Sequence, residues 1–427
     1  MIKDLSSITE PYVRAACIDA YDRLIKLSIV REIRSDLKDK AEDQAIHIFG
    51  ENLRNYLLQP PMKGKVVLGI DPAFRTGCKL VVIDPTGKFI VKDKMFPHQL
   101  NKNEVVPQER YQEAVDTFKR LVLDYNCEIC AMGNGTASRE TEAFVAKTLE
   151  EMKPELEAKG QIVKYIIVNE AGASVYSASD LARDEFPDFH VEERSAVSIA
   201  RRLQDPLAEL VKIDPKAIGV GLYQHDVNQK KLSDMLDEVV GSVVNQVGVN
   251  LNTASASLLK YVSGINSSLA KKIIAYRDSN GKITSREDLK KVSGLGPKAF
   301  EQCAGFLKIP ESENPLDNTW VHPENYEVAK EVLPLVQKNE KVTAALKKEL
   351  EEKYGVGETT INDIIDELAK PNRDPRDGYP APIMQKGVVK FEDLTVGMKV
   401  TGKIKNVVDF GAFVDIGVHQ DAHLIEP

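Results

Sequence analysis

Apolar side chains recur at helical spacing through residues 1–62. An apolar residue stands at every fourth position from Ile25 to Leu37, and a second apolar series runs from Ile46 to Leu57. These periods predict two helices, and Pro60-Pro61 ends the second because proline cannot continue a helix. The segment holds few core residues for an independent domain, so we expect it to pack on something else.

The period changes after Lys65, where short apolar runs bounded by turn residues predict strands. The first runs lie at 66–70, 79–83 and 89–95, and helix and strand then alternate, with helices at 107–123, 140–152 and 173–211 and strands at 128–132 and 162–168. A three-strand meander followed by helix, strand, helix, strand and helix is the order of the ribonuclease H-like fold. We assign this fold to residues 63–212.

Helical periods dominate the next part of the chain, from Lys231 to Phe306 and again from Glu324 to about Ala369. A linker rich in proline, glycine and aspartate follows at 371–387, and β-type runs at 399–406 and 412–416 then flank Phe410-Gly411. The fold class is therefore multi-domain, α/β plus all-α. Beyond the α/β domain we expect helical domains at 231–310 and 316–372 and a β segment at 388–427.

An internal repeat appears when the chain is aligned with itself. The segment LKYVSGIN at 259–266 lines up with LKKVSGLG at 289–296. In each copy a helix ends at a serine, a Gly-apolar-Gly/Asn hairpin turns, and a second helix begins. We expect a positive φ or a close backbone approach at the first and third hairpin positions, since glycine permits both and asparagine tolerates them. The repeat predicts a tandem helix–hairpin–helix between Thr253 and Ile309.

Charge singles out the same region. The whole chain has a formal net charge of −8, which disfavours a protein that coats nucleic acid non-specifically. Between Leu251 and Pro310, however, ten lysines and arginines stand against four acidic residues. This basic island indicates one localised site for a polyanion, although a merely solvated basic surface would have the same composition.

The hairpins supply candidate phosphate-binding groups. Backbone amides of a tight turn, at the N-terminus of the following helix, form a pocket for a backbone phosphate. The candidates are Gly264, Ile265, Asn266, Gly294, Leu295 and Gly296, with Lys271, Lys272 and Lys298 placed to hold a neighbouring phosphate. The second hairpin is the better candidate, and no sequence specificity is expected because such a motif reads no base edges. The alternative is that both hairpins are purely structural.

Two carboxylates stand where nucleases of the ribonuclease H-like fold bind Mg²⁺. Asp71 closes the first strand and Glu170 follows the fifth, but the fourth strand ends in Gly133-Asn134-Gly135 and the helix at 195–203 has no acid on an inward position. A two-metal site needs several converging carboxylates. We therefore expect no metal, no cofactor and no catalytic residue, with Asp71 and Glu170 as relics of a site. A metal-dependent resolvase-like nuclease centred on Asp71 is the alternative.

Composition favours a cytoplasmic protein. Five mostly scattered cysteines fit a reducing compartment better than a disulfide framework. The apolar runs are far shorter than the roughly 20 residues of a membrane span. Acids and arginines stand near the N-terminus where a signal peptide would have an apolar core. We expect no membrane partner.

Longer motifs add a resemblance to a known family. They are GIDPAFRTG at 69–77, GNGTASRE at 133–140, VNEAGASVY at 168–176, GVGLYQHDV at 219–227, the hairpin pair, and VDFGAFVD at 408–415. In this order they resemble the Tex family of transcription accessory proteins over essentially the whole chain. The resemblance implies a YqgF-like ribonuclease H-like domain, the hairpin pair, a helical domain and a C-terminal S1 RNA-binding motif. It also implies nucleic-acid binding coupled to transcription.

The chain departs from the family pattern at both ends. The family carries a long helical region before the YqgF-like domain, so we expect this chain to be a fragment. At 388–427 an S1-type OB barrel is truncated, because about half of the five strands of such a barrel are present. Phe410 and Phe413 match the family's base-stacking aromatics, but an unclosed barrel leaves unpaired edges and is expected to be frayed.

The combined prediction is a non-enzymatic scaffold that binds RNA, DNA or both through backbone phosphates. Its expected partners are nucleic acid and the transcription machinery. A protein-interaction platform built on the helical domains is compatible with this function. The sequence leaves open the preference for RNA or DNA and the oligomeric state.

Overall fold

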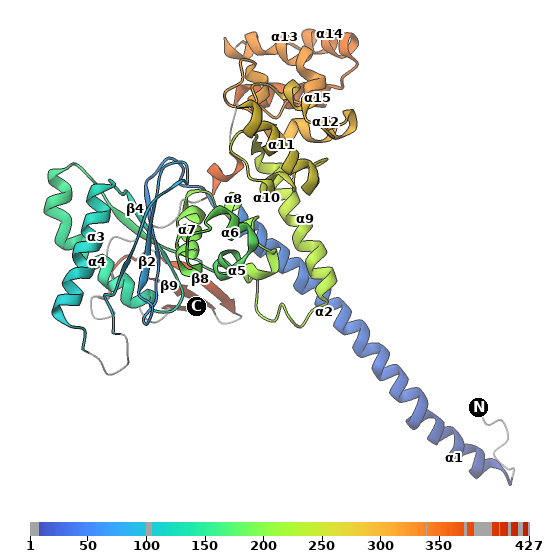
Figure 1. Ribbon diagram of the computed structural model, residues 1–427. Coiled ribbons are helices and arrows are strands. Elements are labelled where there is room, and N and C mark those ends of the chain that lie inside the picture. The colour runs from blue at the N-terminus through green and yellow to red at the C-terminus, as the bar shows by residue number, and fades with distance from the viewer. Residues whose placement is uncertain are drawn as a thin grey trace.

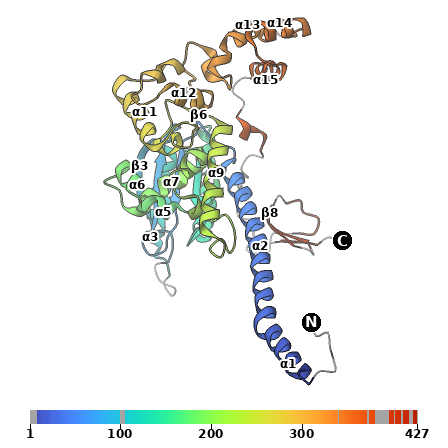
Figure 2. The same cartoon turned by 90° about the vertical axis from the view of Figure 1, so that its right-hand side faces the viewer.

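A computed structural model describes residues 8–99, 105–338, 340–370, 374–379, 395–400, 402–408, 411–416 and 422–425. A long N-terminal helix projects from the body, which consists of an α/β domain and a stack of helical domains (Figure 1). The view in Figure 2 shows the same helix extending away from both. None of the described helices combines the length and the apolar character that a membrane span requires.

The N-terminal helix is continuous. Helix α1 (Glu10–Ala20), a π-helical turn η1 (Tyr21–Ile25) and α2 (Lys26–Leu57) follow one another without a break. The predicted division into two helices is therefore wrong, because no glycine or proline between the two apolar series stops the first helix. The second series packs against α9 (Gln229–Val247), whereas the first, from Ile25 to Leu37, is exposed.

The α/β domain has the predicted ribonuclease H-like order. Its strands are β1 (Val67–Asp71), β2 (Cys78–Ile83), β3 (Phe89–Met95), β4 (Ile129–Gly133) and β5 (Lys164–Val168). They form one sheet in the order β3-β2-β1-β4-β5, in which β1, β4 and β5 are parallel and β2 and β3 are antiparallel. The carboxyl ends of β1, β4 and β5 consequently meet at one edge, the edge that carries the candidate carboxylates.

Helices cover both faces of this sheet. Helices α3 (Gln108–Asp124) and α4 (Ser138–Ala158) pack on the side chains of Leu68 and Ile70, while α7 (Val191–Gln204) packs on the opposite face with Val67. This alternation follows from the period of two in a strand. Gly69 lets α7 lie directly on β1, because a side chain there would overlap the backbone of Ala196.

Short helices lead from the sheet to the hairpin region. They are α5 (Ala173–Ala178), α6 (Asp180–Glu185), α8 (Pro206–Leu210) and η2 (Pro215–Ile218), and α9 follows them. The hairpin region contains α10 (Ala256–Leu259), α11 (Ser267–Asn280), η3 (Arg286–Lys291), α12 (Pro297–Cys303) and η4 (Ala304–Phe306). A two-stranded parallel pair, β6 (Val249–Asn250) with β7 (Leu307–Lys308), closes it. One apolar cluster runs from the end of α2 through α9 into both hairpins, so these parts share a core.

A further helical domain with its own core follows. It consists of η5 (Pro315–Asn318), η6 (Pro323–Asn325), α13 (Tyr326–Gln337), α14 (Ala344–Tyr354) and α15 (Glu358–Ala369). The chain then returns to the α/β domain at η7 (Pro375–Gly378), where the buried Arg376 donates to Asp205 Oδ1 at 2.9 Å and to Asp374.

The described C-terminal residues form an antiparallel sheet in the order β10-β9-β8, with β8 at Lys403–Val408, β9 at Gly411–Asp415 and β10 at Ala422–Ile425. Phe410, one of the two predicted base-stacking rings, lies outside the described residues.

Candidate nucleic-acid interface

The two hairpins share one local structure, as their sequence repeat suggests. Equivalent hydrogen bonds close both turns: Ile265 N to Val262 O at 3.0 Å and Leu295 N to Val292 O at 3.1 Å, then Ala270 N to Asn266 O at 2.9 Å and Phe300 N to Gly296 O at 3.0 Å. The repeated sequence therefore encodes a repeated turn geometry.

The first position of each hairpin is left-handed, with φ 80° at Gly264 and 92° at Gly294. The third position is not. Asn266 has φ −92° and ψ 171°, and Gly296 has φ −78° and ψ 171°. Of the two expected alternatives, a positive φ or a close backbone approach, the first is excluded at this position, because the residue is the N-cap of the second helix and an N-cap takes the extended conformation.

The middle residue of each hairpin faces the core. Ile265 and Leu295 are buried, and their backbone amides are already bonded within the turn. Neither residue thus has a free amide to donate to a phosphate in this conformation. They anchor each turn to the apolar cluster, which holds the neighbouring glycine at the surface.

The hairpins differ in the amides that they leave open. In the first, the Asn266 side chain caps α11 by accepting from Leu269 N at 2.9 Å, while Ser267 N and Ser268 N have no acceptor among the described residues. In the second, Gly296 has no side chain to cap α12, and within the described chain the amides of Lys298 and Ala299 have no acceptor. Free amides at a helix start are satisfied by water or by a ligand. A Cβ placed on Gly296 would meet nothing within 4 Å, so the turn is open.

The first hairpin is partly an internal contact. A Cβ on Gly264 would lie 2.7 Å from Gln302 Cβ and 3.0 Å from Ala299 O, so this turn rests on α12. The two hairpins therefore stabilise each other, and the second has the freer surface.

The predicted lysines differ from several of their neighbours in having no ion pair. Lys271, Lys272 and Lys298 are exposed, and none has an acidic partner in the part of the chain that the structure describes. Lys272 reaches across from α11, so that its Nζ lies 3.0 Å from the position of a Cβ on Gly294. Lys272, from the helix that follows the first hairpin, therefore lies over the turn of the second hairpin.

Other lysines of the basic island are paired. Lys282, Lys290 and Lys291 form ion pairs with Glu311, Glu287 and Asp288 at 3.3, 2.6 and 2.6 Å. Arg286 is buried and has a structural role. Of the three predicted lysines, Lys272 and Lys298 therefore bring charge without an ion pair to the second hairpin.

The structure also brings Asp71 and Glu170 together at the end of the sheet. Burial, with the Glu170 carboxylate nearby, raises the pKa of Asp71 to about 7, against the opposing effects of a Ser195 hydrogen bond and the Lys79 charge. Burial also raises the pKa of Glu170. Side chains at Gly133 or Gly135 would overlap the Glu170 carboxylate, so the Gly-Asn-Gly turn makes room for it.

The position for a third carboxylate is held by other groups. Helix α7 presents Ser195 to Asp71 and the buried Arg202 to the neighbourhood of Glu170. Arg202 Nη1 donates to Asn169 O at 2.9 Å and to Ala171 O at 2.6 Å. Glu192, a nearby acid, pairs with the buried Lys79 at 2.7 Å. Among the described residues no group of three His, Cys, Asp or Glu side chains is arranged to hold a metal ion.

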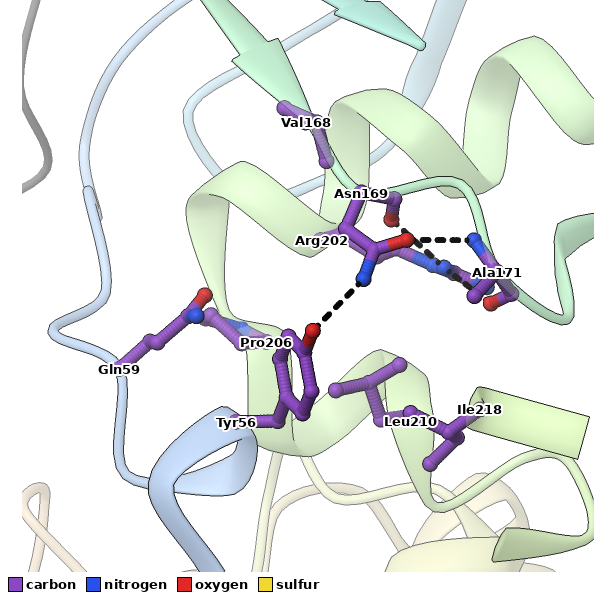
Figure 3. A pocket seen from close by; sticks show the side chains of 9 residues that line it. All are labelled: Tyr56, Gln59, Val168, Asn169, Ala171, Arg202, Pro206, Leu210 and Ile218. Atoms are coloured by element: carbon purple, nitrogen blue, oxygen red, sulfur yellow. Dashed lines mark hydrogen bonds between the residues drawn. The ribbon is translucent and has the colours of Figure 1, made fainter. Parts of the chain in front are cut away.

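Figure 3 shows a hollow beside this region, where the end of α2 meets the α/β domain. Asn169 Nδ2 donates to the Tyr56 hydroxyl at 3.2 Å, and Asn169 Oδ1 accepts from Ala171 N at 2.9 Å. The hollow measures about 40 Å³, which is space for water rather than for a substrate.

Phe413, the second predicted base-stacking ring, packs against a neighbour. Its ring is stacked on His423 across β9 and β10, with centroids 4.8 Å apart and an interplanar angle of 13°. One face of the ring is thereby covered. The sequence alone could not assign His423, because its partner is set by the register of the two strands.

Comparisons with known proteins agree with these domains. Residues 65–204 match the Tex protein YqgF-like domain, 244–308 a helix-hairpin-helix motif and 314–376 an HHH domain. The chain is thus a multi-domain protein in which a YqgF-like domain precedes helix–hairpin–helix domains.

Its relatives identify the family. A Bacillus subtilis protein named YdcI is 52% identical over 99% of this chain and 58% of its own length. The transcriptional accessory protein Tex of Neisseria gonorrhoeae is 47% identical over 93% of this chain and 51% of its own length. The human S1 RNA-binding domain-containing protein 1 is 39% identical over 94% of this chain and 45% of its own length. The chain belongs to the Tex family, and it spans about half the length of these relatives.

Proposed function

We propose that the chain is a non-enzymatic nucleic-acid-binding scaffold that acts in transcription and grips backbone phosphates mainly with its second hairpin. The open start of α12 supports this proposal most directly. There the free amides of Lys298 and Ala299, the Lys298 side chain and the Lys272 ammonium stand around one turn. Amides at a helix start and unpaired ammonium groups both favour a phosphate. Names of relatives that mention transcription and RNA binding agree with this function.

The grip on phosphates has a matched test. We expect Lys271→Gln, Lys272→Gln and Lys298→Gln together to weaken binding of single- and double-stranded DNA and RNA about tenfold or more. The control combines Lys282→Gln, Lys290→Gln and Lys291→Gln, which removes the same charge from ion-paired positions. Fluorescence anisotropy titrations compare the two variants with the wild type. Equal loss of affinity in both variants would mean that only the overall charge matters.

The second candidate is a metal-dependent nuclease, and the pairing of Asp71 with Glu170 is the observation that favours it. Against it stand the buried Arg202 beside Glu170 and the ion pair that engages Glu192. We expect no cleavage of branched DNA or of RNA with Mg²⁺ or Mn²⁺, and unchanged binding in Asp71→Asn. Cleavage that disappears in Asp71→Asn would establish the nuclease instead.

A further inference from the structure

Residues 374–379, called the strap below, follow α15 and bring the chain back to the α/β domain (Figure 1). The sequence predicts a linker in this region, yet Arg376 in the middle of the strap is only 1% exposed. None of the apolar clusters among the described residues includes a residue of the strap. A buried arginine outside every apolar core is not needed for the folding of one domain, so its role lies between domains.

Two carboxylates engage the Arg376 guanidinium completely. Its Nε and Nη2 donate to Asp374 at 2.9 and 2.8 Å, and its Nη1 donates to Asp205 Oδ1 at 2.9 Å. Asp374 belongs to the strap itself. Asp205 belongs to the α/β domain, where it lies between α7 and α8 and caps α8 by accepting from Ala208 N at 3.2 Å. Arg376 therefore ties the strap to a fixed point of the α/β domain.

Two lysines from other parts of the chain surround the same carboxylates. Lys63, at the start of the α/β domain, lies 3.9 Å from Asp205 and 3.8 Å from Asp374. Lys308 of β7, in the hairpin region, is partly buried and close enough to Asp374 for their charges to interact. The strap also lies against α9. The α/β domain and the hairpin region thus both meet the strap at one charge cluster.

A buried ion pair differs from an apolar contact in what it contributes. Its net stabilisation is small, because both charges lose their hydration, but it can specify one arrangement of the parts that it joins. The planar guanidinium bonds two carboxylates at fixed angles. A shift of the strap would leave buried donors without acceptors, which is costly. The pairing of Arg376 therefore suits a contact that sets orientation.

We propose that the strap is a latch that holds the helical domain in one orientation relative to the α/β domain, with Arg376 as its positioning residue. The helical domain is attached to the hairpin region through Arg286, which donates to Leu307 O and Thr319 O, and to the α/β domain through Arg376. The three domains then form a closed ring of contacts. When the latch opens, the joint at Arg286 is left as a hinge. The proposal does not depend on the phosphate grip.

The distance between two spin labels on the full chain tests the latch. Cys17→Ser removes the exposed native cysteine, since the other four cysteines are buried. Glu150→Cys on α4 and Lys348→Cys on α14 then carry the labels, and double electron–electron resonance measures the distribution of their separation. We expect one narrow distribution in this background and a broad one when Arg376→Gln is added.

Hydrogen exchange of the strap gives a second measurement. The Asp377 and Tyr379 amides donate to Asp374 O and Arg376 O within the strap. Their exchange should become about tenfold faster or more in Arg376→Gln, because charge-assisted hydrogen bonds no longer hold the strap closed. The control is Arg183→Gln, which removes an exposed arginine that pairs with Asp180 at 3.2 Å. It should change neither the distance distribution nor the exchange.

Asp374→Asn is a second latch variant, because it weakens the clamp from the strap side without altering either core. It should also broaden the distance distribution, to a smaller degree. A distribution as narrow in both variants as in the background would overturn the proposal, even if the strap amides exchanged faster. Faster exchange throughout the α/β core would also overturn it, since Arg376 would then stabilise the fold rather than set the orientation. Nucleic-acid affinity should stay at the wild-type value in both variants, so the phosphate grip is tested separately by the lysine variants.

Discussion

The two glycines of the second hairpin adopt different backbone conformations, so the same substitution has different effects at the two positions. Gly294 is left-handed at φ 92°, whereas Gly296 is extended and open to solvent. We expect Gly296→Val to bind nucleic acid about tenfold more weakly, since a branched side chain blocks close approach of a phosphate. Its stability should change by less than about 1 kcal/mol, since valine accepts an extended conformation before Pro297.

Gly294→Val is the control, and it should lose roughly 1–2 kcal/mol of stability because valine resists the left-handed region. Thermal melts and anisotropy titrations on the same preparations separate the two effects. Unchanged affinity in Gly296→Val would show that the open turn does not meet phosphate.

Asp71 makes the stability of the folded protein depend on pH. Its folded-state pKa of about 7 exceeds the ordinary value of 3.8, so the folded protein keeps a proton that the unfolded chain releases, and stability falls as pH rises between these values. Asp71→Asn imitates the neutral form. The free energy of unfolding of Asp71→Asn, minus that of the wild type, should increase by roughly 2–4 kcal/mol from pH 4 to pH 7 and then level off.

Urea denaturation across pH measures this difference, with the exposed Asp188→Asn as control. A constant difference between Asp71→Asn and the wild type would show that Asp71 is ionised in the folded protein throughout.

The role of a single residue could be predicted from the sequence where backbone conformation alone determines it. Glycine at the first hairpin position was foreseen from its conformational freedom. The burial of Ile265 and the pairing of Lys79 with Glu192 were not, because both depend on which element packs above the residue. The order of charges along the chain also cannot show which lysines of the basic island have acidic partners.

At the scale of elements, Arg286 joins the hairpin region to the helical domain. Its buried guanidinium donates to Leu307 O at 2.8 Å, to Thr319 O at 2.6 Å and to Val321 O at 2.6 Å. Arg286→Gln would leave buried carbonyls without donors, and each such loss costs about 1–3 kcal/mol. We expect the free energy of unfolding to fall by at least about 3 kcal/mol in total.

Chemical denaturation and hydrogen exchange check this expectation, with the exposed Lys290→Gln as control. Exchange should speed up across the joint in Arg286→Gln, including both the end of the hairpin region and α13. A destabilisation below about 1 kcal/mol would mean that water readily replaces the guanidinium.

Most elements followed from periodicity, and the exceptions have physical causes. The ribonuclease H-like fold could be predicted because a meander followed by alternating helix and strand permits few topologies. The single long α2 was not, because both apolar series fit one helix as well as two. Only the downstream partner α9, which covers one series and leaves the other exposed, distinguishes their roles.

At the scale of the whole molecule, two surfaces differ in charge and shape. The second hairpin is basic and open, while the 219–227 loop exposes two large apolar side chains. The repeat and the charge island located the first surface from the sequence. The surface of the 219–227 loop could not be predicted from the sequence, because the exposure of Leu222 and Tyr223 and the backbone strain at Tyr223 depend on the three-dimensional structure.

The salt dependence of nucleic-acid affinity measures the central claim most directly. Removing one lysine that neutralises a phosphate makes the slope of log K against log salt shallower by about 0.7 for single strands and about 0.9 for duplex. The combined Lys271→Gln, Lys272→Gln and Lys298→Gln variant should therefore have a slope shallower by about 2–3. The ion-paired control triple should keep the wild-type slope. An unchanged affinity and slope in the first variant would contradict phosphate binding at the second hairpin.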